Sequence, residues 1–393
     1  MNLRLKPEKL DALAAARRLA RDFSANAAEL DRTGAFPAAH FEALFAAGLT
    51  RLTTAASHGG GEASLETALS VVSEIAAGEP STALILSMHY INHAAIRQGI
   101  GWSPSAGGAV VESARLQPSL VNALQVEPEA GSPSYGTLPR SRARRAVGGW
   151  RLSGCKRYST GCEGLAWMVA SALTDEPNER LGNFLVTHPG PGIRIEKTWN
   201  VVGMRATGSH DVVFDDVFVP DAFAFDLQPA DPPPPRDPRQ IAWFMTLIGA
   251  VYHGIAKAAR QSVLGFAAAF RPGNIEITLS ALPLIQDQLG EIEVLIDTSE
   301  RLLLSIARDA DAGHEVGPSA GRVRYVVIEN AIRAVDVALR IAGQYGLSRE
   351  HELERHHRNV ICGRTHAPNG ALVRAASAKA ALAELERVEG TFA

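Results

Sequence analysis

Apolar residues recur at three- and four-residue intervals through the first 120 residues of this 393-residue chain. That period places them along one face of an α-helix. It predicts amphipathic helices over residues 6–30, 38–47 and 67–77. A further helix is expected to begin at Pro80, whose fixed φ suits a first helical turn, and its strongly apolar interior indicates burial. We therefore expect an N-terminal helical domain over residues 1–120.

The period changes between Trp150 and Pro220. Short runs rich in β-branched and aromatic residues are separated there by Gly, Pro, Asn and Asp, which is typical of successive antiparallel strands. The runs occupy residues 150–161, 167–172, 183–187 and 199–220. They predict a barrel-like antiparallel β domain over residues 121–227.

Helical spacing returns after the Pro-rich segment of residues 228–238, which has little capacity for a helix or a central strand. Long apolar helices are expected at residues 241–270, 282–307, 321–343 and 372–388. Four such helices in succession favour a C-terminal four-helix bundle, which we place over residues 240–393. Their apolar faces are broad, which favours burial against other copies of the chain.

Composition excludes several classes of function. The net charge is −3, so no basic surface argues for nucleic-acid binding. No apolar run looks long enough to span a bilayer and the N-terminus lacks a signal core, so we expect a cytoplasmic protein. Cys155, Cys162 and Cys362 have no metal-ligand spacing and suit reduced thiols. His89 and His93 share a helix face, but no third ligand accompanies them, so we reject a metal site.

The order of elements and one long signature resemble the acyl-CoA dehydrogenase superfamily of flavoproteins. The signature is G-M-R-A-T-G-S at residues 203–209, followed by V-V-F-D-D-V-F-V-P at residues 212–220. The resemblance covers nearly the whole chain. It implies an α+β, acyl-CoA dehydrogenase-like fold, a flavin cofactor (FAD or FMN) and a homotetramer.

The resemblance also implies a first flavin-contacting loop at L-Q-V-E-P-E-A-G-S-P, residues 124–133. Gly131 and Ser132 match the family pattern there. Val126 replaces the usual Thr, so its backbone amide remains to bond the flavin ring while the hydroxyl contact is lost. Pro133 replaces the usual Asp.

A second flavin loop is implied at K-R-Y-S-T-G, residues 156–161. Tyr158 would cover the flavin ring with its aromatic face. Thr160, with the amides around Ser159, would meet the N5 edge, where preorganised dipoles stabilise the charge of reduced flavin.

Arg205, Ser209 and Arg271 are weaker candidates for ligand binding. By resemblance, Arg205 and Ser209 lie near the substrate mouth, although an Arg in a strand is as often structural. The family's Arg-x-Gln-Phe-Gly segment, which holds the adenosine arm of FAD in a neighbouring subunit, is reduced to Arg271 and Gln286. We therefore expect that arm to be weakly held.

The catalytic carboxylate of the family is missing at both of its usual places. Counting from the landmark Arg358, Ala367 occupies the position of the usual Glu, and Phe244 falls at about the alternative site on the first bundle helix. Without that base, the α-proton of an acyl-CoA has no obvious acceptor. Glu163, Asp237 and Glu350 remain acids that sequence cannot exclude.

These losses resemble the superfamily's two-component flavin monooxygenases, which oxygenate a small substrate with O2 and reduced flavin from a partner reductase. That branch has histidines matching His89 and the His366-x-Pro368 segment, where imidazoles suit proton transfer near neutral pH. Both histidines are therefore candidate catalytic residues, although they also fit a core histidine and a solvated loop histidine. The alternatives are an acyl-CoA dehydrogenase with a relocated base and a non-catalytic scaffold.

Overall fold

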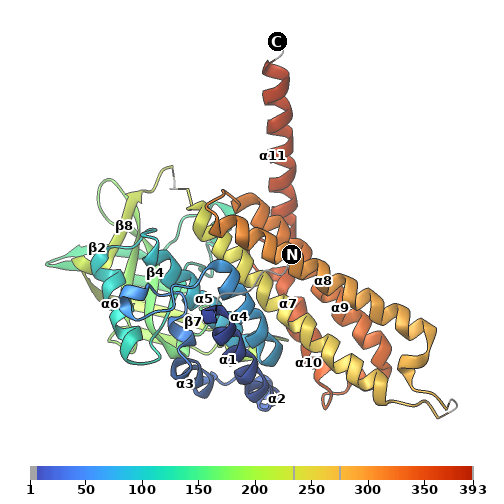
Figure 1. Cartoon of the computed structure of the whole chain (residues 1–393). Coiled ribbons are helices and arrows are strands. Elements are labelled where there is room, and N and C mark those ends of the chain that lie inside the picture. Colours follow the sequence, from blue (N-terminus) through green and yellow to red (C-terminus); the bar gives the residue numbers. More distant parts are fainter. Residues whose placement is uncertain (1–6, 233–234, 274–275, 392–393) are drawn as a thin grey trace.

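The computed structural model describes residues 7–232, 235–273 and 276–391, and its helices and strands follow the predicted order of helical, β and helical parts (Figure 1). The N-terminal part consists of α1 (Pro7–Ser24), α2 (Ala27–Thr33), α3 (Ala38–Ala46), α4 (Leu65–Gly78), α5 (Pro80–Arg97) and α6 (Pro104–Leu116). The helix expected over residues 6–30 is divided into α1 and α2. Ser24 ends α1, and its hydroxyl donates to the Arg21 carbonyl, a local bond that competes with helix continuation.

Helix α5 is the buried centre of the N-terminal part. Most of its side chains are buried, as its apolar sequence predicts. Glu79 caps it by accepting hydrogen bonds from the backbone N–H groups of Ser81 and Thr82, at 3.1 and 2.6 Å. The cap satisfies donors at the start of the helix that have no partner within it.

The central part is an eight-stranded sheet with the order β6-β7-β3-β2-β4-β5-β8, in which β1 also pairs with β4. The strands are β1 (Leu120–Leu124), β2 (Arg142–Ala146), β3 (Gly149–Lys156), β4 (Leu165–Thr174), β5 (Arg180–Thr187), β6 (Ile193–Glu196), β7 (Asp211–Pro220) and β8 (Ala224–Pro229). Antiparallel pairing holds for most neighbours, but β1 and β2 both run parallel to β4. Parallel pairing needs a long crossover, and the loops that follow β1 and β3 supply it.

The C-terminal part contains α7 (Pro238–Ala269), α8 (Pro283–Asp311), α9 (Gly317–Ala342), α10 (Glu352–Ile361) and α11 (Gly370–Thr391). Helices α7, α8 and α9 pack together, and α10 packs against α7 and α9. The helix expected over residues 372–388 forms as α11, but it projects away from the body of the molecule (Figure 1). Its alanines and charged residues make no continuous apolar face, so α10 takes the fourth place beside the three long helices.

Helix α7 corrects one expectation from the sequence. It has 32 residues and contains a window apolar enough to cross a membrane by composition, so the expectation that no run reaches this length is wrong. However, 78% of that window is buried inside the protein. Helix α7 packs against α4, α5, α8, α9 and α10, which makes it the central helix of the folded chain.

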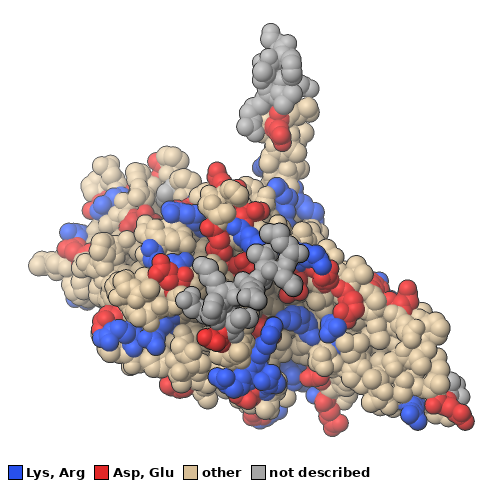
Figure 2. Space-filling view, viewed as in Figure 1, with Lys and Arg blue, Asp and Glu red and all other residues tan. Residues whose placement is uncertain are grey.

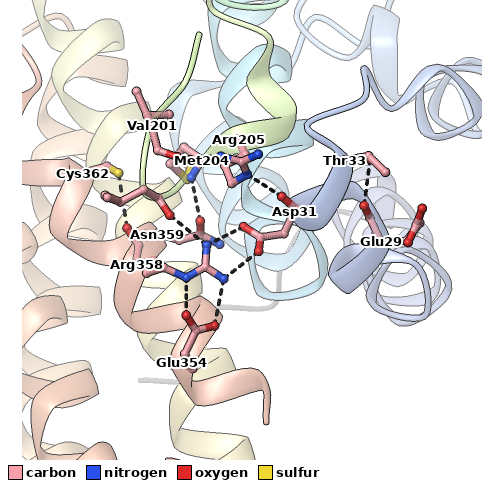
Figure 3. Close-up of polar contacts among 11 residues, drawn as sticks. Glu29, Asp31, Thr33, Val201, Met204, Arg205, Glu354, Arg358, Asn359 and Cys362 are labelled. Atoms are coloured by element: carbon pink, nitrogen blue, oxygen red, sulfur yellow. Dashed lines mark hydrogen bonds and ion pairs between the residues drawn. The ribbon is translucent and has the colours of Figure 1, made fainter. Parts of the chain in front are cut away.

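The three parts meet at the Arg358 side chain on α10 (Figure 3). Its guanidinium donates to both carboxylate oxygens of Asp31 on α2, at 2.9 and 2.6 Å. It also binds Glu354, one helical turn earlier, and the carbonyl of Val202 in the loop before β7. The neighbouring Asn359 accepts from the Met204 N–H at 2.7 Å. One arginine thus joins elements that are more than 300 residues apart in sequence.

The close approach at this junction also explains the glycine that opens the G-M-R-A-T signature. A Cβ on Gly203 would lie 2.0 Å from the Arg358 carbonyl oxygen, so no larger residue fits. The signature therefore holds α10 against the sheet in addition to any role near a ligand.

Replacing Arg358 with Met should lower the free energy of unfolding by about 3 kcal/mol, because Asp31 and Glu354 would be left as mostly buried carboxylates. Their side chains are 15% and 16% exposed. The matched control is Arg301→Met, which breaks an exposed pair with Asp297 and should cost less than about 1 kcal/mol. Denaturant unfolding measures both. Equal losses in the two variants would contradict the role of Arg358 as the junction.

Candidate functional site

The two predicted flavin loops lie side by side, held by a buried ion pair. The Lys156 ammonium, fully buried at the end of β3, donates to the Glu127 carboxylate at 2.5 Å and to the Ser171 carbonyl at 2.6 Å. One residue along, the Arg157 N–H donates to the Val126 carbonyl at 2.8 Å. The two loops are therefore joined both by an ion pair and by a backbone hydrogen bond.

Glu127 organises the first loop through several donors. Its carboxylate accepts from the backbone N–H of Arg140, and from both the N–H and the hydroxyl of Ser141, at 2.6 to 3.1 Å. Burial alone would raise the pKa of Glu127, but the Lys156 charge and these donors outweigh it, so the pKa lies below the usual range. Glu127 is therefore a carboxylate at neutral pH, and its role in the loop is structural.

The first loop is a tight turn that leaves one donor free. Glu127 and Gly131 exchange backbone hydrogen bonds at 3.1 and 2.9 Å, with Gly131 at a φ of 73°. The Ser132 hydroxyl accepts from the Ser134 N–H and so caps the short helix that follows. Within the residues that the structure describes, the Val126 N–H donates to no acceptor. It remains available to a ligand, as the sequence predicts.

The second loop exposes an aromatic ring from a strained backbone. Tyr158 has a φ of 56°, which is rare for a bulky residue, and its side chain is 58% exposed. Its ring meets that of Trp199 edge-on, with centroids 6.1 Å apart. The Ser159 N–H donates to the His210 carbonyl at 3.2 Å, which ties the loop to the G-M-R-A-T-G-S-H segment. Strain of this kind is typical of functional sites.

Thr160 is held from three sides with its hydroxyl proton free. The Ser209 hydroxyl donates to the Thr160 hydroxyl oxygen at 3.1 Å, and the Asn122 amide donates to the Thr160 carbonyl at 3.0 Å. On the third side, a Cβ on Gly161 would lie 2.9 Å from Ile85 of α5, so that helix packs directly on the loop. Because its oxygen accepts from Ser209, the Thr160 hydroxyl can donate its own proton to a ligand.

His89 lies behind this loop with both ring nitrogens occupied. Nε2 donates to the Thr50 carbonyl at 2.8 Å, and Nδ1 accepts from the Val121 N–H at 3.3 Å, so the two backbone groups fix the tautomer. Burial lowers the pKa of His89 to about 4. These contacts support a positioning role through β1, next to Asn122. The catalytic role inferred from the sequence stays a prediction.

His366 lies in the loop between α10 and α11 and is half-buried. Its ring meets Tyr252 of α7 edge-on, with centroids 5.6 Å apart. The Tyr252 ring is itself buried and packs close to Gly363. Burial first, and the Arg324 charge second, lower the pKa of His366 to about 4. Its imidazole is therefore neutral at neutral pH.

The remaining predicted residues lie apart from this group. Arg205 donates to the carbonyls of Asp31 and Val201, at 2.6 and 2.9 Å, so its contacts are structural (Figure 3). Arg271 follows α7 at the end of the C-terminal helices that is remote from the sheet (Figure 1). The structure therefore brings Val126, Tyr158 and Thr160 together, with Ser209 behind them, and leaves Arg205 and Arg271 outside.

Sequence reasoning missed four side chains that build the site: Asn122, Lys156, Tyr252 and Arg324. Lys156 opens the K-R-Y-S-T-G motif and Asn122 is a polar residue within an apolar strand, so both carried a weak signal. Tyr252 and Arg324 lie in long helices, where no local pattern distinguishes them.

Comparison with known proteins establishes the family. Family models of the acyl-CoA dehydrogenase N-terminal, middle and C-terminal domains match residues 6–99, 124–217 and 246–369. The Bacillus subtilis protein YdbM, whose name places it among the acyl-CoA dehydrogenases, is 31% identical over 354 residues, which are 89% of this chain and 91% of YdbM. The chain belongs to the acyl-CoA dehydrogenase family.

Two further relatives show the range of this family. The Pseudomonas putida protein SfnC, whose name describes an FMNH2-dependent monooxygenase, is 26% identical over 389 residues and covers 94% of each chain. The structure of butyryl-CoA dehydrogenase from Megasphaera elsdenii has the same fold, with a TM-score of 0.87, 19% identity, and coverage of 97% of this chain and all of that one. The resemblance inferred from residues 203–220 is confirmed, and the chain is a flavin-dependent oxidoreductase of this superfamily.

Of the three acids that the sequence left open as a family-type base, two are engaged elsewhere and the third is exposed. Glu163 pairs with Lys197 and lies 3.5 Å from His210. Asp237 caps α7 and pairs with Arg239. Glu350 is exposed in the loop before α10. Among the residues that the structure describes, no carboxylate forms an ion pair or hydrogen bond with His366, Tyr252 or Arg324.

Replacing Glu127 with Gln should lower the free energy of unfolding by about 3 kcal/mol, because the Lys156 ammonium would stay buried without its counter-charge. The pKa of Glu127 is lowered by folding, so the loss should be full above the usual glutamate pKa of about 4.3 and shrink as the pH falls below it. Denaturant unfolding at several pH values measures both effects.

The double variant Glu127→Gln with Lys156→Met provides the control, since it removes both charges. It should be more stable than Glu127→Gln alone. A double variant whose loss equals the sum of the two single losses would show that the pair does not couple the loops.

Proposed function

We propose that this protein is a flavin-dependent monooxygenase that uses reduced flavin and O2 to oxygenate a small organic substrate. A separate flavin reductase would supply the reduced flavin. The observation that carries the proposal is the neutral imidazole of His366, which stands in the family's catalytic loop next to Ala367, where a carboxylate would be needed for dehydrogenation. The name of SfnC, a relative along 94% of its length, supports the same chemistry.

The residues at the two loops fit a flavin ring. The exposed face of Tyr158 offers a flat apolar surface, and the Val126 N–H and Thr160 hydroxyl are donors without an acceptor among the residues that the structure describes. Donors of this kind suit the oxygen and nitrogen edge of the isoalloxazine, where reduction builds up negative charge. Gly131 and Ser132 keep the first loop turned, and Ser159 anchors the second.

The reaction balances with one reduced flavin. When bound, reduced flavin supplies two electrons to O2. One oxygen atom then enters the substrate as a hydroxyl group in place of a hydrogen, and the other is released as water. The protein's part is to exclude bulk water, to orient the substrate and to place a hydrogen-bond donor. Because the pKa of His366 is about 4, its role at neutral pH is that of an N–H donor rather than an acid.

The rival function is an acyl-CoA dehydrogenase with a relocated base. It would require Glu163 or Asp237 to leave its present contacts and reach the flavin, or the exposed Glu350 to move there. Arg205 and Ser209 as substrate contacts, and His89 as a second catalytic group, stay predictions under either reading. A non-catalytic scaffold is disfavoured because such a protein has no need for a strained, exposed Tyr158.

The assembly we propose is a homotetramer, and the adenosine arm of FAD would depend on it. Large apolar side chains are exposed on the C-terminal helices and the loops beside them, namely Ile277, Leu284, Val294, Tyr345 and Leu347. Figure 2 shows few charged side chains over the outer end of these helices, whereas both signs are interspersed elsewhere on that face. Arg271 lies at this end and could reach a flavin only from another copy. We propose a cytoplasmic location on composition alone.

The deciding experiment separates the two reactions. The purified protein should bind reduced FMN at least as tightly as oxidised FAD, because only Arg271 and Gln286 remain of the adenosine-binding segment. Mixed anaerobically with reduced FMN and then with O2, it should delay flavin reoxidation relative to free FMN, observed by stopped-flow absorbance. Tightly bound FAD that is bleached anaerobically by an acyl-CoA would overturn the proposal and establish dehydrogenation.

Replacing His366 with Ala should uncouple oxidation from oxygenation once a substrate is found. Loss of the donor should reduce product per flavin oxidised by roughly a hundredfold, with hydrogen peroxide released instead. Flavin affinity and oligomeric state should stay unchanged, because the side chain makes no hydrogen bond within the described part of the chain. Coupling equal to wild type would remove His366 from the reaction.

A further inference from the structure

Arg324 on α9 is a buried cation without a counter-charge. Arg324 as a whole is only 2% exposed to solvent. Across residues 7–232, 235–273 and 276–391, its hydrogen bonds go to backbone carbonyls, no carboxylate forms an ion pair with it, and its Nε is buried without a partner. Burial lowers the pKa of Arg324 to about 10, so it remains charged at neutral pH. A buried charge of this kind destabilises the fold, and its presence calls for another role.

The guanidinium points at the loop that carries His366. One nitrogen donates to the Pro368 carbonyl, and the other donates to the His366 carbonyl at 3.5 Å. The two carbonyl acceptors flank Ala367. The guanidinium therefore spans the segment in which Ala367 stands in place of the family's catalytic carboxylate. The planar guanidinium presents its donors in a rigid geometry, and a lysine could not hold both carbonyls in the same way.

Tyr252 closes the other side of the same group. Its ring contacts the His366 ring edge-on, and its hydroxyl is buried with no partner within the described residues. Gly249, one turn earlier on α7, also lies beside Arg324, since a Cβ there would be in ordinary contact with the Arg324 Cα at 3.9 Å. Helices α7 and α9 therefore clamp the loop between an aromatic ring and a fixed cation.

We propose that Arg324 is a positioning residue that sets both the place and the charge state of His366. This inference rests on the proposed function, in which His366 is the proton-bearing group. Arg324 acts through the loop carbonyls and through the electric field of its guanidinium, without touching substrate or flavin itself. A neutral imidazole beside a fixed positive charge is a hydrogen-bond donor across the neutral pH range, so the reaction would keep this donor without depending on pH.

The other groups near His366 do not supply that field. Tyr252 on α7 is neutral, because burial raises its pKa well above the usual value. On the loop itself, burial raises the pKa of Cys362 to about 11, so the thiol is neutral too. Arg364 is exposed and paired with Glu329 of α9, which screens its charge. Arg324 is thus the unpaired charge among the described groups packed around the imidazole.

The test measures the titration of His366 directly, in the intact protein without flavin. Hydrogen–deuterium exchange at the imidazole Cε1 depends on protonation, and mass spectrometry reads it from single peptides. Trypsin releases residues 365–374, in which His366 is the only histidine. The proteins compared are wild type, Arg324→Gln, Arg324→Lys and the control Arg364→Gln, whose peptide of residues 359–374 also contains a single histidine.

In wild type, a plot of the Cε1 exchange rate against pH should show no titration midpoint between about pH 5 and about pH 8, because His366 titrates below that window. Arg324→Gln should move the midpoint up by roughly one pH unit, to the lower edge of this window, because burial remains as the larger cause of the lowered pKa. Arg324→Lys should keep it low, while the backbone amides of residues 363–369 exchange faster. Arg364→Gln should behave as wild type in both measurements.

An unchanged midpoint in a folded Arg324→Gln protein would overturn the inference. If that variant does not fold, Arg324→Lys still tests the positioning role. Amide exchange of residues 363–369 equal to wild type would show that the guanidinium does not hold the loop. Neither readout involves turnover. A failure of the proposed function would instead appear as acyl-CoA oxidation by the wild-type protein, with these exchange results unaffected.

Discussion

The guanidinium of Arg358 is the point where the three parts of this molecule become one structure. Its partners are a carboxylate on α2, a carboxylate on its own helix and a carbonyl in the loop before β7. No single part can satisfy that charge, because the acceptors come together only when all three are docked. The G-M-R-A-T signature passes through the same junction, with Gly203 against the α10 backbone and Met204 bonded to Asn359. Asn359 suits this place because its side-chain amide oxygen accepts the Met204 N–H bond.

Docking in this way assembles the site that we propose. The sheet contributes two loops fastened by the Glu127–Lys156 pair, the N-terminal part contributes α5 behind Thr160, and the C-terminal part contributes the His366 loop. Each loop is held mainly through side chain to backbone bonds, which fix atoms more firmly than exposed surface pairs. The groups left without partners, an amide, a hydroxyl proton and an aromatic face, are those that a flavin ring can use.

The change of chemistry that we propose within this shared fold follows from a small local difference. A dehydrogenase of this family needs a carboxylate that is charged beside the flavin, whereas this chain presents an imidazole kept neutral by burial and by a neighbouring cation. In this chain, α9 holds the loop through its backbone carbonyls and α7 holds it through the Tyr252 ring. Replacing one side chain could therefore redirect the reaction while leaving the fold unchanged.

By itself, the sequence determined the order of helices and strands, the family, and the two loops around Val126 and Tyr158, because periodicity and short motifs are local properties. It also located His366 by its distance from Arg358. Tertiary structure alone decided that α11 leaves the bundle, that β1 and β2 run parallel to β4, and that both nitrogens of His89 are engaged by backbone groups. It alone revealed Arg324, since a buried charge without a counter-charge among the described residues is defined by groups that are distant in sequence. Whether a group is buried and which partner it finds depend on residues from the whole fold, so a local sequence pattern does not determine them.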